Sequence, residues 1–308
     1  MVITAESLRA RCARDMSRTP RGFAGRSWLR RAFLEVPREA FVPDRVWWPS
    51  RADDGRYPLI DRNEKPRAWL KAVYLPGAAL ITQIDDGTVP PSGPADGAFT
   101  SSISSPGVVI ELLRHLAPEP GERILEIGTG TGYTTALLAH RAGAGGVVTV
   151  EIDARLAARA RGRLRAVGMS AQVITGDGEQ GHADGRLYDR IVSTASVREI
   201  PLAWLQQLRP GGILVAPLDS PFGYDLLVRL VADGHGNASG CAVAPVEFMR
   251  VRGQRVPRPH ADLGWPGGLD PAQWRDLRVE AGREGQHITR RPPARTAQAA
   301  RAARDQAR

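Results

Sequence analysis

An acidic residue followed by three alternating glycines is the part of this chain best suited to chemistry. Residues 123–133 read R-I-L-E-I-G-T-G-T-G-Y, so an apolar run carries Glu126 and is followed by Gly128, Gly130 and Gly132. Glycine lets the backbone come close to a ligand because it has no Cβ. The next residues, T-T-A-L-L-A, predict a helix whose first N–H groups face the turn. The segment therefore predicts a nucleotide-type cofactor site.

The spacing of the glycines distinguishes between two cofactors. A dinucleotide-binding turn reads G-x-G-x-x-G and binds a pyrophosphate. Here the third glycine comes one residue early, and Tyr133 stands where a dehydrogenase has glycine. Glu126 would repel a pyrophosphate, but it suits the ammonium and sulfonium groups of S-adenosylmethionine. We therefore predict S-adenosylmethionine, bound by Glu126 and by the turn residues Gly128, Thr129, Gly130, Thr131 and Gly132. A glycine-rich turn without a ligand is the plain alternative.

Four later segments repeat a strand–helix period in register with this turn. Residues 147–151 form a β-branched strand ending in Glu151, which can accept hydrogen bonds from both ribose hydroxyls. Asp153 suits the capping of the next helix. A third strand runs into Asp177 and Gly178, which can face the adenine amino group, although an ordinary surface turn would read the same. Two more strands follow, and together these segments predict an α/β fold with a Rossmann-like, doubly wound, mostly parallel sheet.

Composition excludes several classes of protein. The 308 residues allow one large or two modest domains, and no apolar run approaches membrane-spanning length. The N-terminus lacks the pattern of a signal peptide, so we expect a cytoplasmic protein without a membrane partner. Cys12 and Cys241 have no metal or redox spacing, so no metal is expected.

The net charge of +9 does not by itself indicate a nucleic-acid partner. Six arginines and one aspartate lie in the last 20 residues, where no aromatic side chains alternate with them. A single-strand binder would interleave aromatic and basic residues. We therefore expect a solvated, disordered tail and no nucleic-acid partner.

The order of the remaining segments suggests four parts. We expect a helix near residues 28–36, a strand at 79–84 followed by a D-D-G turn, and a helix over 106–115; the rest of 49–99 reads as irregular. Strands are expected at 224–231 and 241–251. The predicted parts are an N-terminal helical segment with an irregular substrate-side insertion (1–104), the cofactor-binding core (105–253), a loosely built extension around Trp265 and Trp274 (254–288), and an Arg/Ala-rich tail (289–308).

Several motifs together resemble the protein-L-isoaspartate (D-aspartate) O-methyltransferases. They are V-P-R-E-A-F-V-P at 36–43, T-S-S-I-S-S-P at 100–106, L-E-I-G-T-G-T-G-Y at 125–133 and G-D-G at 176–178, with looser matches at 208–217 and 246–250. The glycine motif alone fits any class I methyltransferase. The resemblance covers roughly residues 29–253. The long region at 49–99 and the extension beyond 253 depart from the compact repair enzymes and resemble elongated actinobacterial members associated with maturation of ribosomally made peptides.

The resemblance implies methylation of a carboxylate on a peptide or protein that carries aspartate or isoaspartate. The family serine at the methyl-acceptor site corresponds to Ser104, with Ser102 as a second candidate; Ser105 is better placed to cap the helix that begins at Pro106. The cofactor residues carry over onto Glu126, the glycine turn, Glu151, Asp177 and Gly178. The ester would then lead to a succinimide and to aspartate or isoaspartate.

Other functions remain open at this point. General repair of isoaspartate and dedicated maturation of one peptide use the same reaction. A small-molecule or protein N-methyltransferase would often carry an Asn/Asp-Pro-Pro-Tyr motif after the fourth strand, and residues 193–196 lack it. A non-catalytic module that binds RNA or a protein through the cofactor fold and the basic tail is the alternative from another class.

Overall fold

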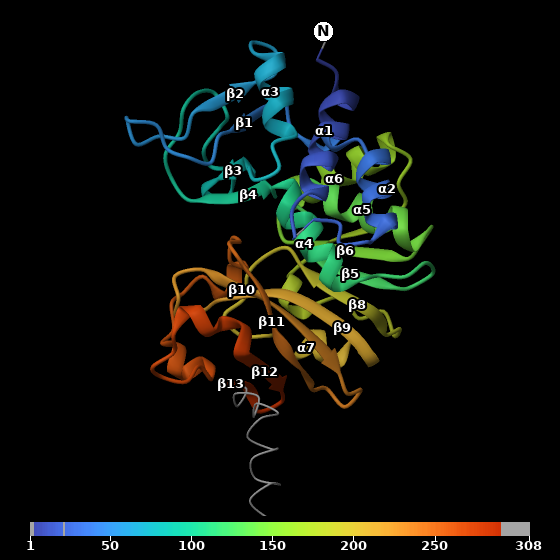
Figure 1. Cartoon of the computed structure of the whole chain (residues 1–308), viewed down its shortest axis with the longest axis vertical. Helices are drawn as coiled ribbons and strands as arrows, with labels where there is room; N and C mark the ends of the chain where they lie inside the picture. The colour runs from blue at the N-terminus through green and yellow to red at the C-terminus, as the bar shows by residue number, and fades with distance from the viewer. Residues whose placement is uncertain (1–2, 21, 291–308) are drawn as a thin grey trace, which may run out of the picture.

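A computed structural model describes residues 3–20 and 22–290, and its centre is a nine-stranded sheet with the order β13-β12-β11-β10-β9-β8-β5-β6-β7 (Figure 1). Five neighbouring strands run parallel: β5 (Ile124–Ile127), β6 (Val147–Glu151), β7 (Gln172–Thr175), β8 (Tyr188–Ser193) and β9 (Leu208–Leu218). Four antiparallel strands extend the sheet beyond β9: β10 (Asp225–Ala232), β11 (Ala238–Val246), β12 (Leu277–Gly282) and β13 (Gly285–Arg290). The predicted α/β class with a mostly parallel central sheet is confirmed.

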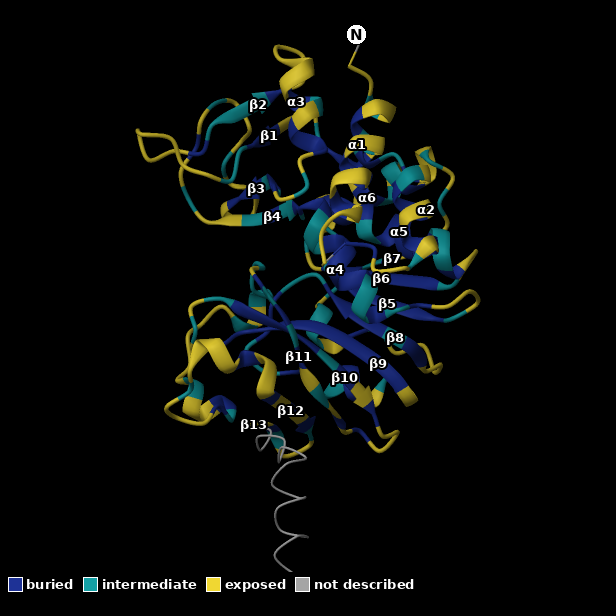
Figure 2. Cartoon of the chain, in the orientation of Figure 1, coloured by how far each residue is buried: buried dark blue, intermediate teal, exposed yellow. Residues whose placement is uncertain are grey.

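Alternating side chains of the parallel strands enter two cores. In β9, Ile213 and Val215 face one core while Leu214 and Ala216 face the other, as the two-residue period of a strand requires. The first core takes in buried residues of α1 (Ala5–Ser17), α2 (Ser27–Glu35), α4 (Pro106–Leu116), α5 (Tyr133–Ala142) and α6 (Ala154–Ala166), and the second takes in α7 (Leu202–Gln206). Figure 2 shows the sheet as the most buried layer. Buried on both faces, these strands read as continuous apolar runs.

The region predicted to be irregular contains a second sheet, so that prediction is wrong. Its strand order is β2-β1-β3-β4, with β1 (Arg45–Trp47), β2 (Leu59–Asp61), β3 (Leu80–Ile84) and β4 (Phe99–Ile103), and α3 (Pro66–Val73) lies between β2 and β3 in sequence. Only β3 was predicted, with the turn η2 (Asp85–Gly87) after it. The other strands have three to five residues and long polar connections, so their apolar side chains show no readable period.

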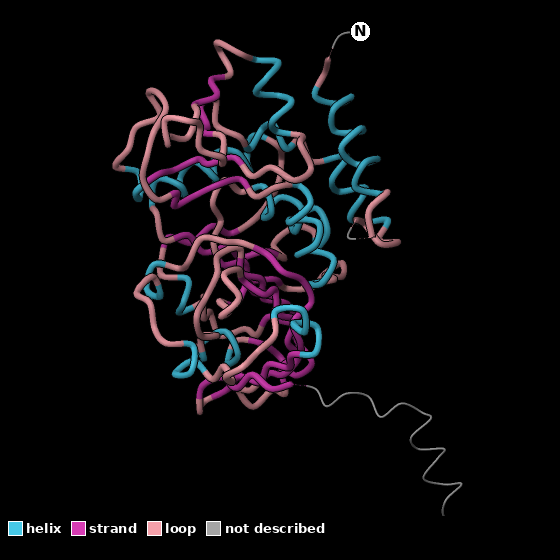
Figure 3. The backbone as a smooth tube through the Cα atoms, turned by 60° about the vertical axis from the view of Figure 1, so that its left-hand side comes forward, coloured by secondary structure: helices cyan, strands magenta, loops and turns pink. Residues whose placement is uncertain are grey.

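This small sheet has a core of its own. Trp47, Tyr57, Ile81 and Ile84 are buried together, and Tyr57 pairs with Ala95 through two backbone hydrogen bonds. The carbonyl oxygen of Ser102 in β4 lies close to Gly130, which follows β5, so this sheet (β1–β4 in Figure 1, with a second view of the backbone in Figure 3) lies beside the carboxyl end of β5. The insertion is therefore a built structure next to the place where an α/β sheet binds its ligand.

The extension beyond residue 253 is only partly as predicted. Trp265 and Trp274 lie among short 3₁₀ turns but are buried in the second core. Residues 277–290 then form the hairpin β12–β13, which pairs with β11 and lengthens the main sheet. Prolines are frequent in the first half of the extension, and they led to the prediction of a loose segment in which this hairpin was not expected. The predicted tail lies outside the described residues from 291 onward, and Thr289 and Arg290 belong to β13. The four part boundaries stay a prediction.

The described residues carry two further findings. None of their helices is long and apolar enough to cross a membrane. Among the same residues, no three His, Cys, Asp or Glu side chains gather in a way that could hold a metal ion.

Candidate cofactor and acceptor site

The glycine turn between β5 and α5 has a backbone that other residues would adopt only under strain. Gly128, Gly130 and Gly132 have φ angles of 89°, 53° and 90°, all in the left-handed region. A Cβ on Gly128 would lie 2.7 Å from the hydroxyl oxygen of Thr194. The alternating glycines are thus required by the turn itself and by the close approach of the loop after β8.

Glu151, at the end of β6, closes the turn from the neighbouring strand. Its carboxylate accepts the N–H of Gly130 at 2.8 Å and the N–H of Asp153 at 3.1 Å. Burial raises the pKa of Glu151, while these two backbone donors favour its charged form. As predicted, Asp153 caps α6, accepting the N–H groups of Arg155 and Leu156.

One cavity brings together nearly all the residues that the sequence singled out. Its lining includes the turn (Gly128, Thr129, Gly130 and Thr131), Glu151, Asp177, Gly178 and the two candidate acceptor serines, Ser102 and Ser104. Gly132 is the N-cap of α5 and lies just outside that lining. The cofactor candidates and the acceptor candidates therefore face one space, although the serines lie on β4 and the turn after it, and the cofactor candidates follow strands of the main sheet.

Glu126 is placed differently from the other candidates. It is fully buried beneath the turn, outside the cavity lining, and accepts hydrogen bonds from the hydroxyls of Thr149 (2.8 Å) and Thr135. Burial raises the pKa of Glu126 to about 7. Its Oε1 atom has no hydrogen-bond partner among the described residues. A buried carboxylate with a free lone pair under the turn fits a cofactor that carries positive charge, and it does not fit a pyrophosphate.

The acceptor serines lie at the end of β4 and in the turn that leads into α4. Ser105 caps α4 by accepting the N–H of Val108 at 3.4 Å, as predicted, so Ser104 is not needed for capping. In the described part of the chain, the hydroxyls of Ser102 and Ser104 have no hydrogen-bond partner, and both side chains are partly exposed to the cavity. They are available to a ligand.

A buried arginine fixes the backbone of the acceptor turn. Arg38, from the V-P-R-E-A-F-V-P motif, is fully buried and donates to the carbonyl oxygens of Ser104 (2.7 Å) and Val73 (2.8 Å). Its guanidinium lies 4.9 Å from the ring centre of Tyr133, the first residue of α5. Arg38 thus connects the acceptor turn to the helix that follows the glycine turn. The sequence marked this motif only as part of the resemblance.

Sequence reasoning missed the charged side chains across the cavity mouth. Arg252 and Arg255 line the cavity and contact Asp86 of the η2 turn, Arg255 with two hydrogen bonds of 2.6 and 3.0 Å and Arg252 at 3.1 Å. Gln83 lines the cavity from β3 and donates to Asp153 at 2.9 Å. We call Asp86, Arg252 and Arg255 the mouth cluster. The D-D-G turn and the run R-V-R-G-Q-R were visible in the sequence, but nothing local indicates that they meet.

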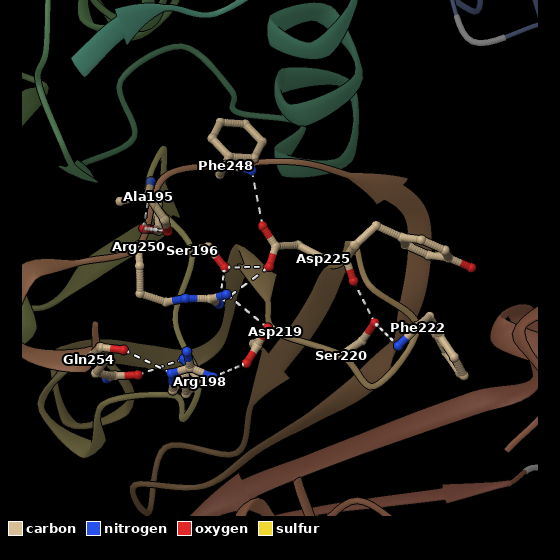
Figure 4. A network of polar contacts seen from close by, with 12 residues as sticks. Ala195, Ser196, Arg198, Asp219, Ser220, Phe222, Asp225, Phe248, Arg250 and Gln254 are labelled. Carbon is tan, nitrogen blue, oxygen red and sulfur yellow. Dashed lines mark hydrogen bonds and ion pairs between the residues drawn. The ribbon is translucent and has the colours of Figure 1, made fainter. Parts of the chain in front are cut away.

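A polar network holds the segment after β8 against the segment after β11 (Figure 4). Arg250 donates to Ser196 (2.8 Å) and Asp219 (2.8 Å), and the Ser196 hydroxyl donates to Asp225 at 2.7 Å. Backbone hydrogen bonds join Ser196 to Met249 and Val251 on either side of Arg250. The network therefore positions Met249, Arg250 and Val251, which form one wall of the cavity.

Comparison with known proteins agrees with this geometry. A family model of protein-L-isoaspartate(D-aspartate) O-methyltransferases matches residues 93–255, more than half of the chain. A protein-L-isoaspartate O-methyltransferase from Methylorubrum extorquens is 34% identical over 209 residues, which are 68% of this chain and 90% of that protein. One from Methanothermobacter thermautotrophicus is 35% identical over 233 residues, or 73% and 89% of the two chains. A shorter match, to the enzyme from Ignicoccus hospitalis, is 38% identical over 137 residues and covers 44% of this chain and 65% of that protein.

Solved structures show the same fold. A protein-L-isoaspartate O-methyltransferase matches with a TM-score of 0.65 and 18% identity, over 91% of this chain and 99% of that chain. One from Plasmodium falciparum, in complex with S-adenosyl-L-homocysteine, matches with a TM-score of 0.57 and 16% identity, over 82% and 99%. The predicted family, enzyme class and cofactor are confirmed. This chain belongs to the protein-L-isoaspartate(D-aspartate) O-methyltransferase family, whose enzymes transfer a methyl group from S-adenosylmethionine to a protein carboxylate.

Proposed function

We propose that this chain methylates the free carboxylate of an aspartyl or isoaspartyl residue in a peptide or protein, which is the side-chain carboxylate of aspartate or the α-carboxylate of isoaspartate. The observation that carries the proposal is the single cavity lined by both the glycine turn and the two free serine hydroxyls. A methyl donor seated on the turn and a carboxylate seated on the serines would face each other across that space.

The residues fit separate tasks. In this proposal, Glu151 accepts hydrogen bonds from the ribose hydroxyls, Asp177 and Gly178 contact the adenine, and the backbone of the glycine turn contacts the amino-acid part of the cofactor. All of these residues line the cavity, which supports the assignment. When bound, S-adenosylmethionine supplies the methyl group. Ser104 and Ser102 donate hydrogen bonds to the acceptor carboxylate and orient one oxygen. The wall at Met249–Val251 limits the space on the far side.

The reaction needs alignment more than acid–base chemistry. A free side-chain carboxylate has a pKa near ~4, so it is already ionised at neutral pH and no strong general base is required. Alignment of oxygen, methyl carbon and sulfur can lower the barrier by up to ~7–11 kcal/mol. The backbone amide that follows the acceptor then attacks the ester, methanol leaves, and hydrolysis of the succinimide gives aspartate or isoaspartate.

We further propose that the chain modifies a dedicated, ribosomally made peptide at aspartate. The β1–β4 sheet supports this because it is a folded structure that carries Ser102 and leads into Ser104, whereas a repair enzyme must admit damaged sites in many sequences. General isoaspartate repair is the alternative, and the two differ in the acceptor they select.

Mass spectrometry of paired peptides tests both levels of the proposal. Each pair carries aspartate or isoaspartate in one sequence and is incubated with the full chain and S-adenosylmethionine. Formation of a methyl ester or of the succinimide supports carboxylate methylation. Broad use of isoaspartate with rejection of aspartate would contradict the dedicated role. Seeing neither product with any peptide would contradict the reaction itself.

Ser104→Ala tests the acceptor assignment. Loss of one hydrogen bond to a charged carboxylate should lower kcat/KM for the peptide by about tenfold, while affinity for S-adenosylhomocysteine stays the same. Ser239→Ala, at an exposed position of β11, is the matched control. Equal activity of the two variants would move the acceptor role away from Ser104, and the double variant with Ser102→Ala would show whether the neighbouring serine takes it over.

A further inference from the structure

A second groove opens beside the acceptor cavity and is continuous with it. Its walls include three aromatic side chains, Tyr57 and Phe99 from the insertion and Phe248 from the segment after β11. Four residues line both spaces: Thr100, Met249, Arg250 and Arg255. A chain that reaches the serines could therefore continue into the groove without leaving the surface.

Strand β4 connects the two spaces. Phe99 and Thr100, at its start, line the groove, and the residues from Thr100 to Ser104 line the cavity. In the described sheet, β4 is an edge strand that pairs with β3 alone. The carbonyl oxygen of Ser102 lies 3.7 Å from the place where Gly130 would carry a Cβ, so β4 approaches the glycine turn. An extended peptide beside an edge strand can pair its backbone with that strand.

The groove presents aromatic surface to solvent. Phe99 is 42% exposed although it lies on a strand, and its ring packs in a T-shaped arrangement with that of Tyr57, with 6.2 Å between ring centres. The Arg51 guanidinium stacks on the other ring of this pair, 4.4 Å from the centre of Tyr57. This stacking fixes Tyr57 beneath Phe99 and leaves the Phe99 ring free for a ligand.

Charge contributes little to selection in the groove. Arg51 is paired with Asp96, Arg255 with Asp86 and Arg250 with Asp219, so the three arginines that line the groove are compensated within the chain. Asp85 adds one further negative charge to the wall. The groove therefore does not resemble a site for a strongly acidic or strongly basic partner, and its aromatic surface favours an apolar side chain.

We propose that this groove binds the peptide segment that flanks the acceptor residue and selects a large apolar side chain in it. The inference rests on the proposed function and names the substrate class: an extended peptide that carries this side chain at a fixed distance from its acceptor. Phe99 precedes Ser102 and Ser104 by three and five residues, which is about 10–17 Å along a strand. The selected side chain thus lies three to five positions from the acceptor, on one side of it.

The test uses short fluorescent peptides with one isoaspartate or aspartate in an alanine and glycine background. A single phenylalanine is placed at each of the five positions on either side of the acceptor in turn. Binding to the full chain saturated with S-adenosylhomocysteine is measured by fluorescence anisotropy, and methylation is measured separately. We expect phenylalanine three to five positions from the acceptor to tighten binding about tenfold over the all-alanine background, as burial of one aromatic side chain predicts.

The Phe99→Ala variant then connects this preference to the groove. It should reduce the preference to less than about twofold. Leu187→Ala removes another exposed apolar side chain, outside the groove, and should keep the preference. Unchanged melting temperature and S-adenosylhomocysteine affinity show that both variants are folded.

The outcomes separate the groove from the reaction. Binding with the predicted preference but without methylation would contradict the proposed function and leave the groove supported. Three results would contradict the proposed role of the groove. They are methylation without any positional preference, a preference that persists in Phe99→Ala, and no binding of any peptide.

Discussion

The two halves of the cavity are built by different means. The cofactor half comes from one short stretch, the glycine turn after β5, and from the ends of the next two parallel strands. Its shape resides in the backbone, in three left-handed glycines and one strand-end carboxylate. The acceptor half combines β3, β4 and the segment 249–255, and its contacts are made by side chains from distant parts of the sequence. Cofactor binding is thus a local property, and acceptor geometry is a tertiary one.

Removing Arg38 should have the largest effect and should damage the acceptor half more than the cofactor half. Arg38→Met leaves the carbonyls of Val73 and Ser104 without their buried donor, which should lower the free energy of unfolding by about 3 kcal/mol. Urea unfolding measures that loss. We also expect kcat/KM for a peptide to fall further than affinity for S-adenosylhomocysteine. Arg30→Met, at an exposed position of α2, is the control. If Arg38→Met lowered kcat/KM for the peptide and affinity for S-adenosylhomocysteine equally, the difference between the two halves would be contradicted.

Glu151→Ala should damage the halves in the opposite order. The variant removes the acceptor of two backbone N–H groups and the proposed ribose partner, so affinity for S-adenosylhomocysteine should fall about 100-fold by calorimetry. Peptide affinity should change little. Glu280→Ala, on the exposed face of β12, should match the parent chain. Normal cofactor uptake by folded Glu151→Ala would remove this residue from the site.

The same contrast explains how much the sequence could predict. Local patterns predict the glycine turn, the strand that ends in Glu151, the turn with Asp177 and the parallel class of the sheet, because glycine spacing and apolar runs report backbone geometry directly. The cofactor role of Glu126 stays a prediction. Its place beneath the turn, where Thr135 and Thr149 donate hydrogen bonds to it, is marked by no motif. The mouth cluster and the four-stranded sheet depend on pairings between segments as far apart as Asp86 and Arg255. Such pairings have no local signal.

Glu126, beneath the glycine turn of the cofactor half, should make the stability of the chain depend on pH. Burial raises its pKa from 4.5 to about 7, so the folded chain retains a proton that the unfolded chain releases. The stability contributed by this protonated group is fully present below about pH 4.5 and is lost as the pH rises through about 7. Between about pH 5 and pH 8, the ligand-free chain should lose about 2 kcal/mol more unfolding free energy than Glu126→Gln, whose side chain does not titrate. If the unfolding free energies of the parent chain and of Glu126→Gln changed equally with pH, the pKa of Glu126 would not be raised in the folded chain.

Asp86→Asn should have the smallest effect. It should change the rate at which the cofactor product leaves the cavity and should leave the methyl-transfer step unchanged. The mouth cluster joins the insertion to the segment after β11, and Arg252 also lies 3.6 Å from Asp153, beside the proposed ribose site. A cofactor that passes this mouth must separate these charges, and partly exposed ion pairs of this kind contribute less than about 1 kcal/mol. We therefore expect S-adenosylhomocysteine to dissociate about threefold faster from Asp86→Asn in stopped-flow measurements.

Added salt should speed release of S-adenosylhomocysteine from the parent chain but not from Asp86→Asn, because screening weakens the ion pairs of the mouth cluster. Asp54→Asn breaks only a local pair with Arg56 in the insertion and should release the ligand at the parental rate. Should all three chains respond equally to salt, the contact between the halves would be structural only, and entry to the cofactor half would be independent of the insertion.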